Sequence, residues 1–293
     1  MFWIFIAFLS PLFYAATNVF DNYFVNLHFK NPITLIFFAS VFNIVFLPFI
    51  LLIQTPALPT METLPFFMLI GAIDVIYLYP YYRALQEDDT SNVLAFFYVG
   101  SVFVPIFAYF IANETLTLRY YMGFFLLIIS WTILSLNKYS RPVSTAAILM
   151  ILCSLLVSIE LVVYRYIFAS VSWSTGVFWS MFFATLFVLP IFFVKKQRQS
   201  IIEHIPRFKR CFHLFLVEEL FAFLGLAAYT YAVFLVPATL VRGIGALQPF
   251  ILLVLAIFLG KFFPFKEGLS TPDLVKKSIA FFLIVIGVFL IVK

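Results

Sequence analysis

The chain has 293 residues, of which 65% are hydrophobic and only 11% are charged, whereas soluble domains carry roughly 25% charged residues. A mean hydropathy of +1.11 agrees with this, so the composition excludes a soluble protein and predicts an integral membrane protein. The formal net charge of +5 does not indicate nucleic-acid binding, because the basic residues gather at the ends of apolar segments, where they mark membrane faces.

Ten apolar segments are long enough to cross a bilayer, which takes about 20 helical residues. These runs are too long for barrel strands and do not alternate in polarity, so the predicted fold is all-α. The expected transmembrane helices lie near residues 2–27, 32–53, 63–86, 90–112, 119–137, 144–169, 174–194, 209–235, 238–260 and 275–292.

Short polar or proline-containing stretches, such as Asn31-Pro32, separate these segments. The longest is near residues 195–208, where Lys195, Lys196, Arg198 and Arg207 predict a loop. No basic residue precedes the apolar run that starts at Phe2, so we expect a retained first helix and not a signal peptide.

An internal repeat divides the chain near Ser140. Residues 123–130 read Gly-Phe-Phe-Leu-Leu-Ile-Ile-Ser, and residues 280–287 read Ala-Phe-Phe-Leu-Ile-Val-Ile-Gly. Five segments fall in residues 1–140 and five in residues 141–293. An odd number of spans per repeat inverts one half relative to the other, which is a common plan of secondary transporters. We therefore expect two inverted five-helix repeats.

Short motifs accompany this plan in both halves. The second half contains Pro237-Ala238-Thr239-Leu240-Val241 and Ala246-Leu247-Gln248-Pro249-Phe250, and the first contains Tyr82-Arg83-Ala84-Leu85 and Asn113-Glu114-Thr115-Leu116. With these motifs the chain resembles the EamA-type drug/metabolite transporters over nearly its whole length. The resemblance implies a ten-helix transporter fold and names no substrate. One departure is Gly260-Lys261, where the family often has Gly-Glu.

Ionisable residues inside the spans are the candidates for a binding site. Each costs about 2.5 to 3.5 kcal/mol at the bilayer centre on insertion scales, so those present usually face a cavity or a partner. In the third segment, tyrosines follow an aspartate at three and seven residues, on the same helical face. We expect a cavity lined by Asp74, Glu160, Glu218 and Arg242, with Asp21, Tyr77 and Tyr81 beside them.

Two structural explanations compete with binding at these positions. Asp74, Glu160, Glu218 and Arg242 can form ion pairs that hold helices in register. Asp21, Arg83 and Arg165 lie near helix ends and can reach the headgroup region instead.

Other chemistry finds no sequence support. The cysteines, Cys153 and Cys211, have neither CxxC nor metal-site spacing, and a buried free thiol is the simpler interpretation. The sequence contains no HExxH, GxSxG, P-loop or GxGxxG motif, so we expect no enzyme, no cofactor and no ATP-driven pump.

The expected function is therefore secondary transport of a small organic solute across the cell (inner) membrane by alternating access. The excess of acidic residues favours a cationic or zwitterionic solute or proton coupling, because aromatic faces and carboxyl groups suit ammonium groups. Alternatives are an exporter of amino acids or drug-like compounds, and a non-transporting assembly subunit or membrane enzyme. The expected partners are the solute and the lipid bilayer, with no nucleic acid, in a monomer or homodimer.

Charge distribution predicts the orientation. EamA-type transporters usually keep both termini in the cytoplasm, which would place the odd-numbered connections outside. Those connections hold nearly all the Lys and Arg outside the spans, including Lys30, Lys138, Lys195, Lys196 and Lys276. Basic residues near helix ends resist translocation. The sequence thus predicts that both termini face away from the cytoplasm, against the family pattern.

Overall fold

The protein is described from a computed structural model, in which every regular element of the described residues is helical. The structure describes residues 2–99, 102–115, 117–135 and 145–259, together with residues 275, 279, 280, 282, 283, 286, 287 and 290. The predicted tenth segment, 275–292, therefore lies largely outside the described residues.

The first half contains helices that pair into longer spans. Helix α1 (Phe2–Tyr23) continues through a π-helical turn, η1 (Phe24–His28). The remaining elements are α2 (Pro32–Phe42), η2 (Asn43–Val45), α3 (Leu47–Ile53), α4 (Leu64–Ile76), α5 (Leu78–Glu87), α6 (Thr90–Val99), α7 (Phe103–Ala112) and α8 (Leu118–Ser135).

The second half begins with α9 (Thr145–Ile167), which is buried along much of its length. It is followed by α10 (Trp173–Val188), η4 (Leu189–Phe193), α11 (Lys195–Leu235), α12 (Ala238–Gly245) and α13 (Gln248–Leu259). Ser172 caps the start of α10, because its side chain accepts a hydrogen bond from the backbone N–H of Thr175.

Among the described residues, seven helices are long and apolar enough to cross a membrane. An eighth span is formed if the bent pair Thr90–Tyr98 and Phe103–Ala112 is counted as one. The prediction of a multi-pass, all-helical membrane protein is confirmed for the described part. The count of ten and the inverted repeats remain predictions.

The predicted loop at residues 195–208 is wrong, because these residues form the first part of α11. Polarity alone suggested a loop, but Lys, Gln, Arg and Glu are good helix formers, and the only breaker is Pro206. Asn31 attaches this extension to α2 by donating hydrogen bonds to Gln197 and Ser200. We call residues 195–210 the basic arm, and its Lys and Arg residues are exposed.

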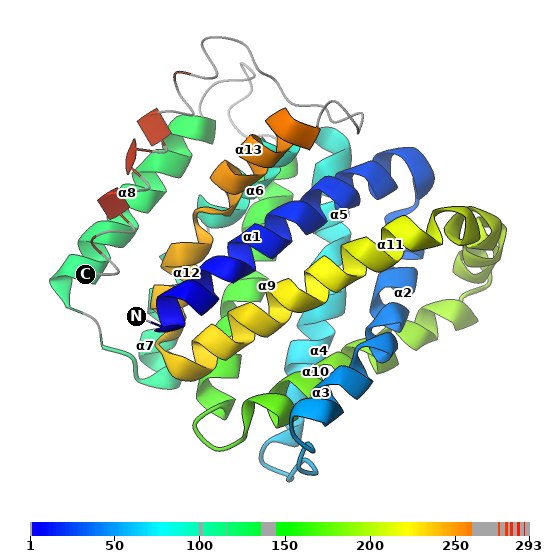
Figure 1. Cartoon of the computed structure of the whole chain (residues 1–293), viewed down its shortest axis with the longest axis horizontal. Coiled ribbons are helices and arrows are strands. Elements are labelled where there is room, and N and C mark those ends of the chain that lie inside the picture. Colours follow the sequence, from blue (N-terminus) through cyan, green and yellow to red (C-terminus); the bar gives the residue numbers. More distant parts are fainter. Residues whose placement is uncertain are drawn as a thin grey trace.

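Helices α1 and α11 run side by side across one face of the molecule (Figure 1), and they form one of its most extensive contacts. Behind them, α9 contacts α4, α5, α6 and α7. Aromatic rings fill the contacts of α11, as in the stacked pair Phe46–Phe223 with centroids 4.8 Å apart.

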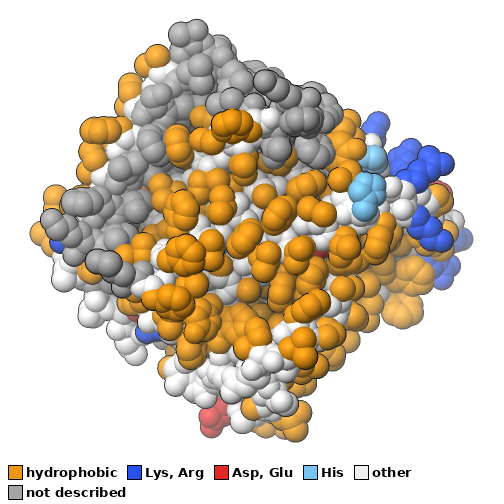
Figure 2. Space-filling view, in the orientation of Figure 1, with side chains coloured by type: hydrophobic (Ala, Val, Ile, Leu, Met, Phe, Trp, Pro, Cys, Tyr) orange, Lys and Arg blue, Asp and Glu red, His pale blue; other side chains and the backbone are white. Residues whose placement is uncertain are grey.

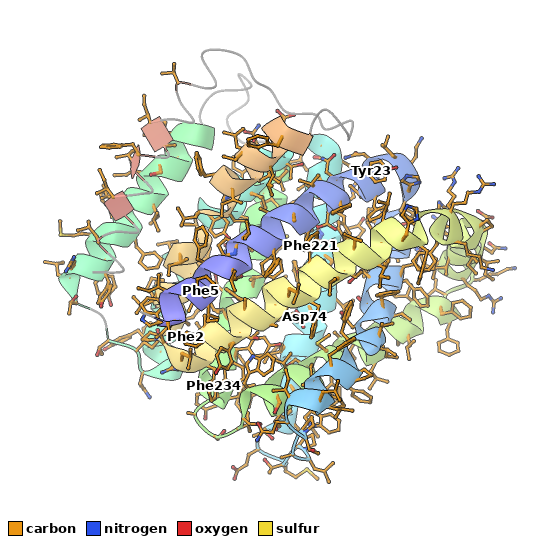
Figure 3. All side chains as sticks on the ribbon, in the orientation of Figure 1. Phe2, Phe5, Tyr23, Asp74, Phe221 and Phe234 are labelled. Atoms are coloured by element: carbon orange, nitrogen blue, oxygen red, sulfur yellow. The ribbon has the colours of Figure 1, made fainter. Side chains whose placement is uncertain are left out.

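Much of the described surface on the face seen in Figure 2 is apolar. The face in Figure 2 is covered by hydrophobic side chains, while Lys and Arg gather at the edge where α11 begins. Phe2 and Phe5 are 66% and 62% exposed, whereas Asp74 lies among the helices (Figure 3). This distribution suits a protein whose sides face lipid and whose polar residues face its interior.

Candidate functional site

One cavity of about 200 Å³ lies among α1, α4, α5, α6, α9, α11, α12 and the start of α13. All the residues predicted to face a cavity line it: Asp21, Asp74, Tyr77, Tyr81, Glu160, Glu218 and Arg242. They come from six helices, so the fold brings together residues that are up to 221 positions apart, from Asp21 to Arg242. Their role in substrate binding stays a prediction.

Asp21 stands at the end of a directed chain of hydrogen bonds. Tyr81 donates to the Asp21 carboxylate over 2.9 Å, and Asn18 donates to the Tyr81 hydroxyl over 2.6 Å. Gln248 donates to Asn18 over 2.6 Å, and Tyr98 donates to Gln248 over 2.7 Å. Every donor points towards Asp21, and the chain joins α1, α5, α6 and α13.

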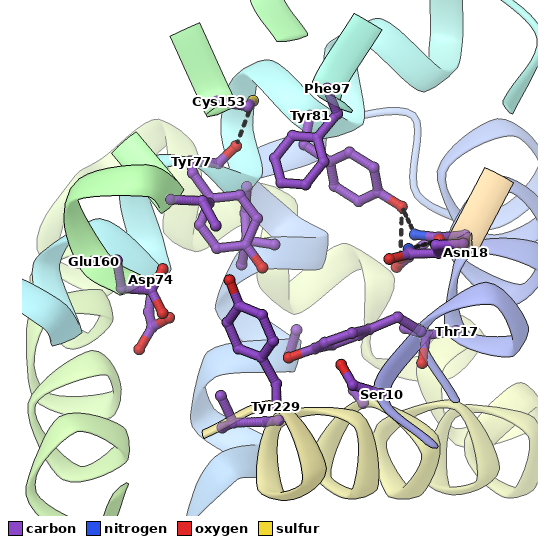
Figure 4. A pocket seen from close by; sticks show the side chains of 18 of the residues that line it. Ser10, Thr17, Asn18, Asp74, Tyr77, Tyr81, Phe97, Cys153, Glu160 and Tyr229 are labelled. Carbon is purple, nitrogen blue, oxygen red and sulfur yellow. Dashed lines mark hydrogen bonds between the residues drawn. The ribbon is translucent and has the colours of Figure 1, made fainter. Parts of the chain in front are cut away.

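Asp74 and Glu160 form a second acidic group on the opposite side of the cavity (Figure 4). Asp74 comes from α4 and Glu160 from α9, and their side chains lie next to each other. Tyr77 follows Asp74 at the junction of α4 and α5, where its carbonyl accepts a hydrogen bond from the Cys153 thiol. Cys153 is therefore a buried free thiol in the cavity wall.

Arg242 lies on α12 with its guanidinium against aromatic rings. Its central carbon is 4.3 Å from the Phe97 ring centroid and 4.7 Å from that of Tyr98. It also donates to the Ser154 hydroxyl over 3.3 Å and to the Phe97 carbonyl over 3.5 Å. Cation–π contacts and hydrogen bonds thus stabilise the charge inside the protein.

Glu218 and Glu219 occupy adjacent positions on α11, and both are 5% exposed. Both line the cavity, where they lie near Asp21. Oxygen Oε1 of Glu219 has no hydrogen-bond partner among the described residues. A buried carboxylate oxygen without a partner is costly, so this atom is placed to receive a donor from a ligand or a proton.

The charges of the cavity are strongly unbalanced. Among the described residues that line it, Asp21, Asp74, Glu160, Glu218 and Glu219 carry carboxyl groups, and only Arg242 carries a guanidinium. Buried like charges repel each other strongly in a low-dielectric interior. The arrangement therefore attracts cations or protons. No cluster of three His, Cys, Asp or Glu side chains suited to a metal ion occurs in the described part of the chain.

Two of the arginines expected near helix ends lie away from the cavity. Arg83 forms an exposed ion pair with Glu87, with an N–O distance of 3.5 Å. Arg165 lies 3.6 Å from Glu114 and donates hydrogen bonds to the carbonyls of Val233 and Phe234 at the end of α11. Arg165 therefore links the end of α9 to Glu114 after α7 and to the end of α11.

The sequence did not single out several residues of the cavity wall as site candidates. Glu219 is the neighbour of Glu218, and both reach the cavity although adjacent helical positions point about 100° apart. Gln248 and Tyr98 are identified as part of the site only by the hydrogen-bond chain to Asp21. The one sequence feature that could have indicated them is the polar Gln248 within a predicted apolar span.

Comparisons with known proteins agree with this picture. The EamA-like transporter family matches residues 1–136 of the chain. A solved structure described only as "Crystal structure of protein" matches with a TM-score of 0.67 and 16% identity, covering 99% of this chain and 95% of the other. At that identity the likeness shows the fold alone. No curated protein matches the chain. The resemblance to EamA-type transporters is confirmed over the matched residues.

Proposed function

We propose that this multi-pass membrane protein, whose first 136 residues match the EamA-like transporter family, is a secondary transporter of a small organic cation. The observation that supports this most directly is the cavity itself. Among the described residues that line it, five carry carboxyl groups, namely Asp21, Asp74, Glu160, Glu218 and Glu219, and one, Arg242, carries a guanidinium. The proposed location is the cell (inner) membrane, with the protein acting as a monomer or homodimer.

Size and wall chemistry support a narrow substrate. The cavity volume of about 200 Å³ is below the roughly 300 to 1,000 Å³ of pockets for drug-sized ligands. Tyr14, Tyr77, Tyr98, Tyr229 and Phe97 line it, and aromatic faces attract organic ammonium groups. The site therefore suits a small amine better than a bulky drug-like compound.

Alternating access requires that the two halves of the chain move relative to each other around the site. The hydrogen-bond chain from Tyr98 through Gln248 and Asn18 crosses between the halves inside the cavity. A substrate that binds Asp21 adds to or replaces contacts in this chain, so it affects both halves at once. A ligand shifts a conformational equilibrium only by binding the two states differently, and a site that spans both halves meets that requirement.

Proton exchange is the energy source that the cavity supports. A carboxyl group can hold a proton or a cation, so the arrival of one displaces the other. We propose that proton entry releases the amine and that proton loss prepares the site for the next amine. This scheme needs no ATP-binding motif, in agreement with the sequence.

Arg242 supports a second candidate, export of an amino acid, because a zwitterion needs a cationic partner for its carboxylate. Its guanidinium already has the Phe97 and Tyr98 rings and the Ser154 hydroxyl as partners. For that reason we favour a cation over a zwitterion. A non-transporting assembly subunit or membrane enzyme finds less support, since neither requires carboxyl groups from four different helices around one cavity.

Flux in proteoliposomes tests the proposal. The purified full chain should carry a small primary amine, such as n-butylamine, down its gradient, and an opposing proton gradient should accelerate this flux. Butyrate and butanol, which match the amine in size, should not be carried above the protein-free background. Amine flux equal to that of protein-free vesicles would overturn the proposal, and carriage of glycine in place of the amine would favour the second candidate.

A further inference from the structure

The acidic residues of the cavity fall into two groups. Asp21, Glu218 and Glu219, from α1 and α11, form the first group, which we call the Asp21 cluster. Asp74 and Glu160, from α4 and α9, form the second group, which we call the Asp74 pair. Figure 4 shows Asp74 and Glu160 on one side of the cavity and, on the other, Asn18 and Tyr81, which belong to the hydrogen-bond chain that ends on Asp21.

On two helical spans, the residues that belong to the two groups are seven positions apart. On the α4–α5 span, Asp74 lies seven residues before Tyr81, which binds Asp21. On α1, Tyr14 lies near the Asp74 pair and seven residues before Asp21. Seven residues at about 1.5 Å each correspond to about 10 Å. Along both helices, the backbone positions that belong to the two groups are thus offset by about two helical turns.

The space between the groups is walled by rings and apolar side chains. Figure 4 shows Tyr77 between Asp74 and Glu160 on one side and Asn18 and Tyr81 on the other. Tyr229 faces Tyr77 across the cavity (Figure 4). Leu78 and Leu226 also line it. A methylene chain can pack along such a wall.

The Asp21 cluster also contains a buried carboxylate oxygen that has no hydrogen-bond partner among the described residues, Oε1 of Glu219. Glu219 is 5% exposed and lines the cavity. An ammonium group carries three donors and can satisfy such an oxygen with a charge-assisted bond of about 2.8 Å. A metal ion fits less well, because no metal-binding cluster occurs among these residues.

We propose that the substrate is an aliphatic α,ω-diamine that binds with one ammonium group at the Asp21 cluster and the other at the Asp74 pair. This inference rests on the proposed transport of organic cations and specifies their class. The backbone rise of about 10 Å between the two groups sets the scale of the proposal: with a hydrogen bond of about 2.8 Å at each end, the two nitrogens would lie roughly 5 to 10 Å apart. Chains of four to six carbons span that distance.

A length series tests this inference on the wild-type protein. The melting temperature of the purified full chain is measured with 1,3-diaminopropane, 1,4-diaminobutane, 1,6-diaminohexane and 1,8-diaminooctane, and with n-hexylamine at the same ionic strength. We expect stabilisation by the four-carbon and six-carbon diamines, with affinity at least tenfold above that of hexylamine, and weaker effects at both ends of the series.

Three other outcomes of the length series would contradict the inference. Equal affinity for hexylamine and 1,6-diaminohexane would overturn the two-site inference but leave the proposed transport of cations intact. Stabilisation by no amine at all, together with no amine flux, would overturn both. Affinity that rises steadily to the eight-carbon diamine would show an apolar effect without a second charged site, and would also overturn the inference.

Variants then assign the two ends. The pair D74N/E160Q replaces both carboxyl groups of the Asp74 pair with amides of similar shape and should reduce diamine affinity to the level of hexylamine. The pair E218Q/E219Q leaves Asp21 in its cluster and should weaken diamine binding several-fold. Variant E87Q, at the exposed Arg83–Glu87 pair, is the matched control and should keep the preference for diamines. Melting temperatures without ligand show which variants fold. A preference for diamines that persists in both folded double variants contradicts the assignment.

Discussion

The backbone N–H of Ala238 donates a 2.8 Å hydrogen bond to Oε1 of Glu114, so a residue just after α7 caps the first turn of α12. The Thr239 hydroxyl donates to the other Glu114 oxygen over 3.1 Å, and Arg165 of α9 lies 3.6 Å away. A negative charge at a helix N-terminus is favourable. Glu114 therefore connects the two halves of the chain through one side chain that is only 7% exposed.

The first prediction follows from this contact. Variant E114Q removes the charge that Arg165 and the start of α12 share, and leaves the Arg165 guanidinium without its carboxylate partner. We expect a loss of roughly 1 to 3 kcal/mol in stability, measured by denaturant or thermal unfolding in detergent. Variant E87Q breaks an exposed ion pair and should cost at most about 1 kcal/mol. Equal losses would show that Glu114 does not hold the halves together.

A second prediction concerns the chain of hydrogen bonds that ends on Asp21. Variant Y81F removes the hydroxyl that donates to Asp21 and accepts from Asn18. Both partners are buried, so we expect a loss of about 1 to 3 kcal/mol in stability and a several-fold fall in amine flux. Tyr79 is 46% exposed on the same helix, and Y79F should leave both measurements near wild type. Unchanged flux in Y81F would exclude a role for this hydroxyl in binding.

Most of the charged residues of the cavity wall could be predicted because charge is costly inside a membrane. The predicted candidates, from Asp21 to Arg242, were chosen for their place inside apolar segments, and the structure puts all of them around one cavity. The cost of burying an ionisable group makes this signal independent of any particular fold.

The rest could not be predicted, for two physical reasons. Contacts such as Tyr98 to Gln248 join residues 150 positions apart, and nothing in local sequence encodes such a pairing. Polarity also fails to separate a loop from a helix outside the bilayer. Helix α11 has 41 residues, about twice the number that crosses the hydrocarbon core, and its first part, the basic arm, turns away from the long straight run (Figure 1).

A third prediction concerns pH. Protons and ammonium groups compete for the same carboxyl groups, so amine affinity should fall as pH falls. Variant D74N removes one competing group from the Asp74 pair. We therefore expect weaker amine binding at neutral pH and a shallower dependence of flux on pH. The shift of melting temperature with added amine at neutral pH measures the binding, and proteoliposome flux between pH 5 and 8 measures the pH dependence, with E87Q as the control for both. If D74N keeps the wild-type dependence of flux on pH, the assignment of Asp74 to the binding site is wrong.

A fourth prediction tests the close packing of α4 against α10. A methyl group added at Gly71 would lie 2.6 Å from the Ala184 nitrogen and 2.7 Å from Cβ of Phe183. Helix propensity favours alanine by at most about 1 kcal/mol, whereas overpacking costs about 1 to 3 kcal/mol, and here the clash involves backbone that cannot turn aside. Variant G71A should therefore lower the melting temperature.

The matched control is G245A, where the nearest atom is the Tyr98 hydroxyl at 3.3 Å. The end of that side chain can shift slightly, so the loss of stability should be smaller than in G71A. An equal or higher melting temperature for G71A would mean that α4 and α10 are not packed this closely.

The last prediction decides the orientation in the membrane. The basic arm is hydrogen-bonded to Asn31 and Thr34 at the start of α2, so it lies at the membrane face where the first span ends. Gln54, after α3, accepts a hydrogen bond from Ser174 at the start of α10, which places it at the opposite face. The positive-inside rule assigns the basic arm to the cytoplasm, and the N-terminus then faces away from it.

Single cysteines at Gln199, in the basic arm, and Thr55, after α3, are both at exposed positions. The native cysteines, Cys153 and Cys211, are buried and give little background. With an impermeant maleimide on intact cells (spheroplasts if there is an outer membrane), T55C should react and Q199C should react only after lysis. The reverse pattern would mean that the orientation usual for EamA-type transporters holds, and that the basic arm has been translocated against its charge.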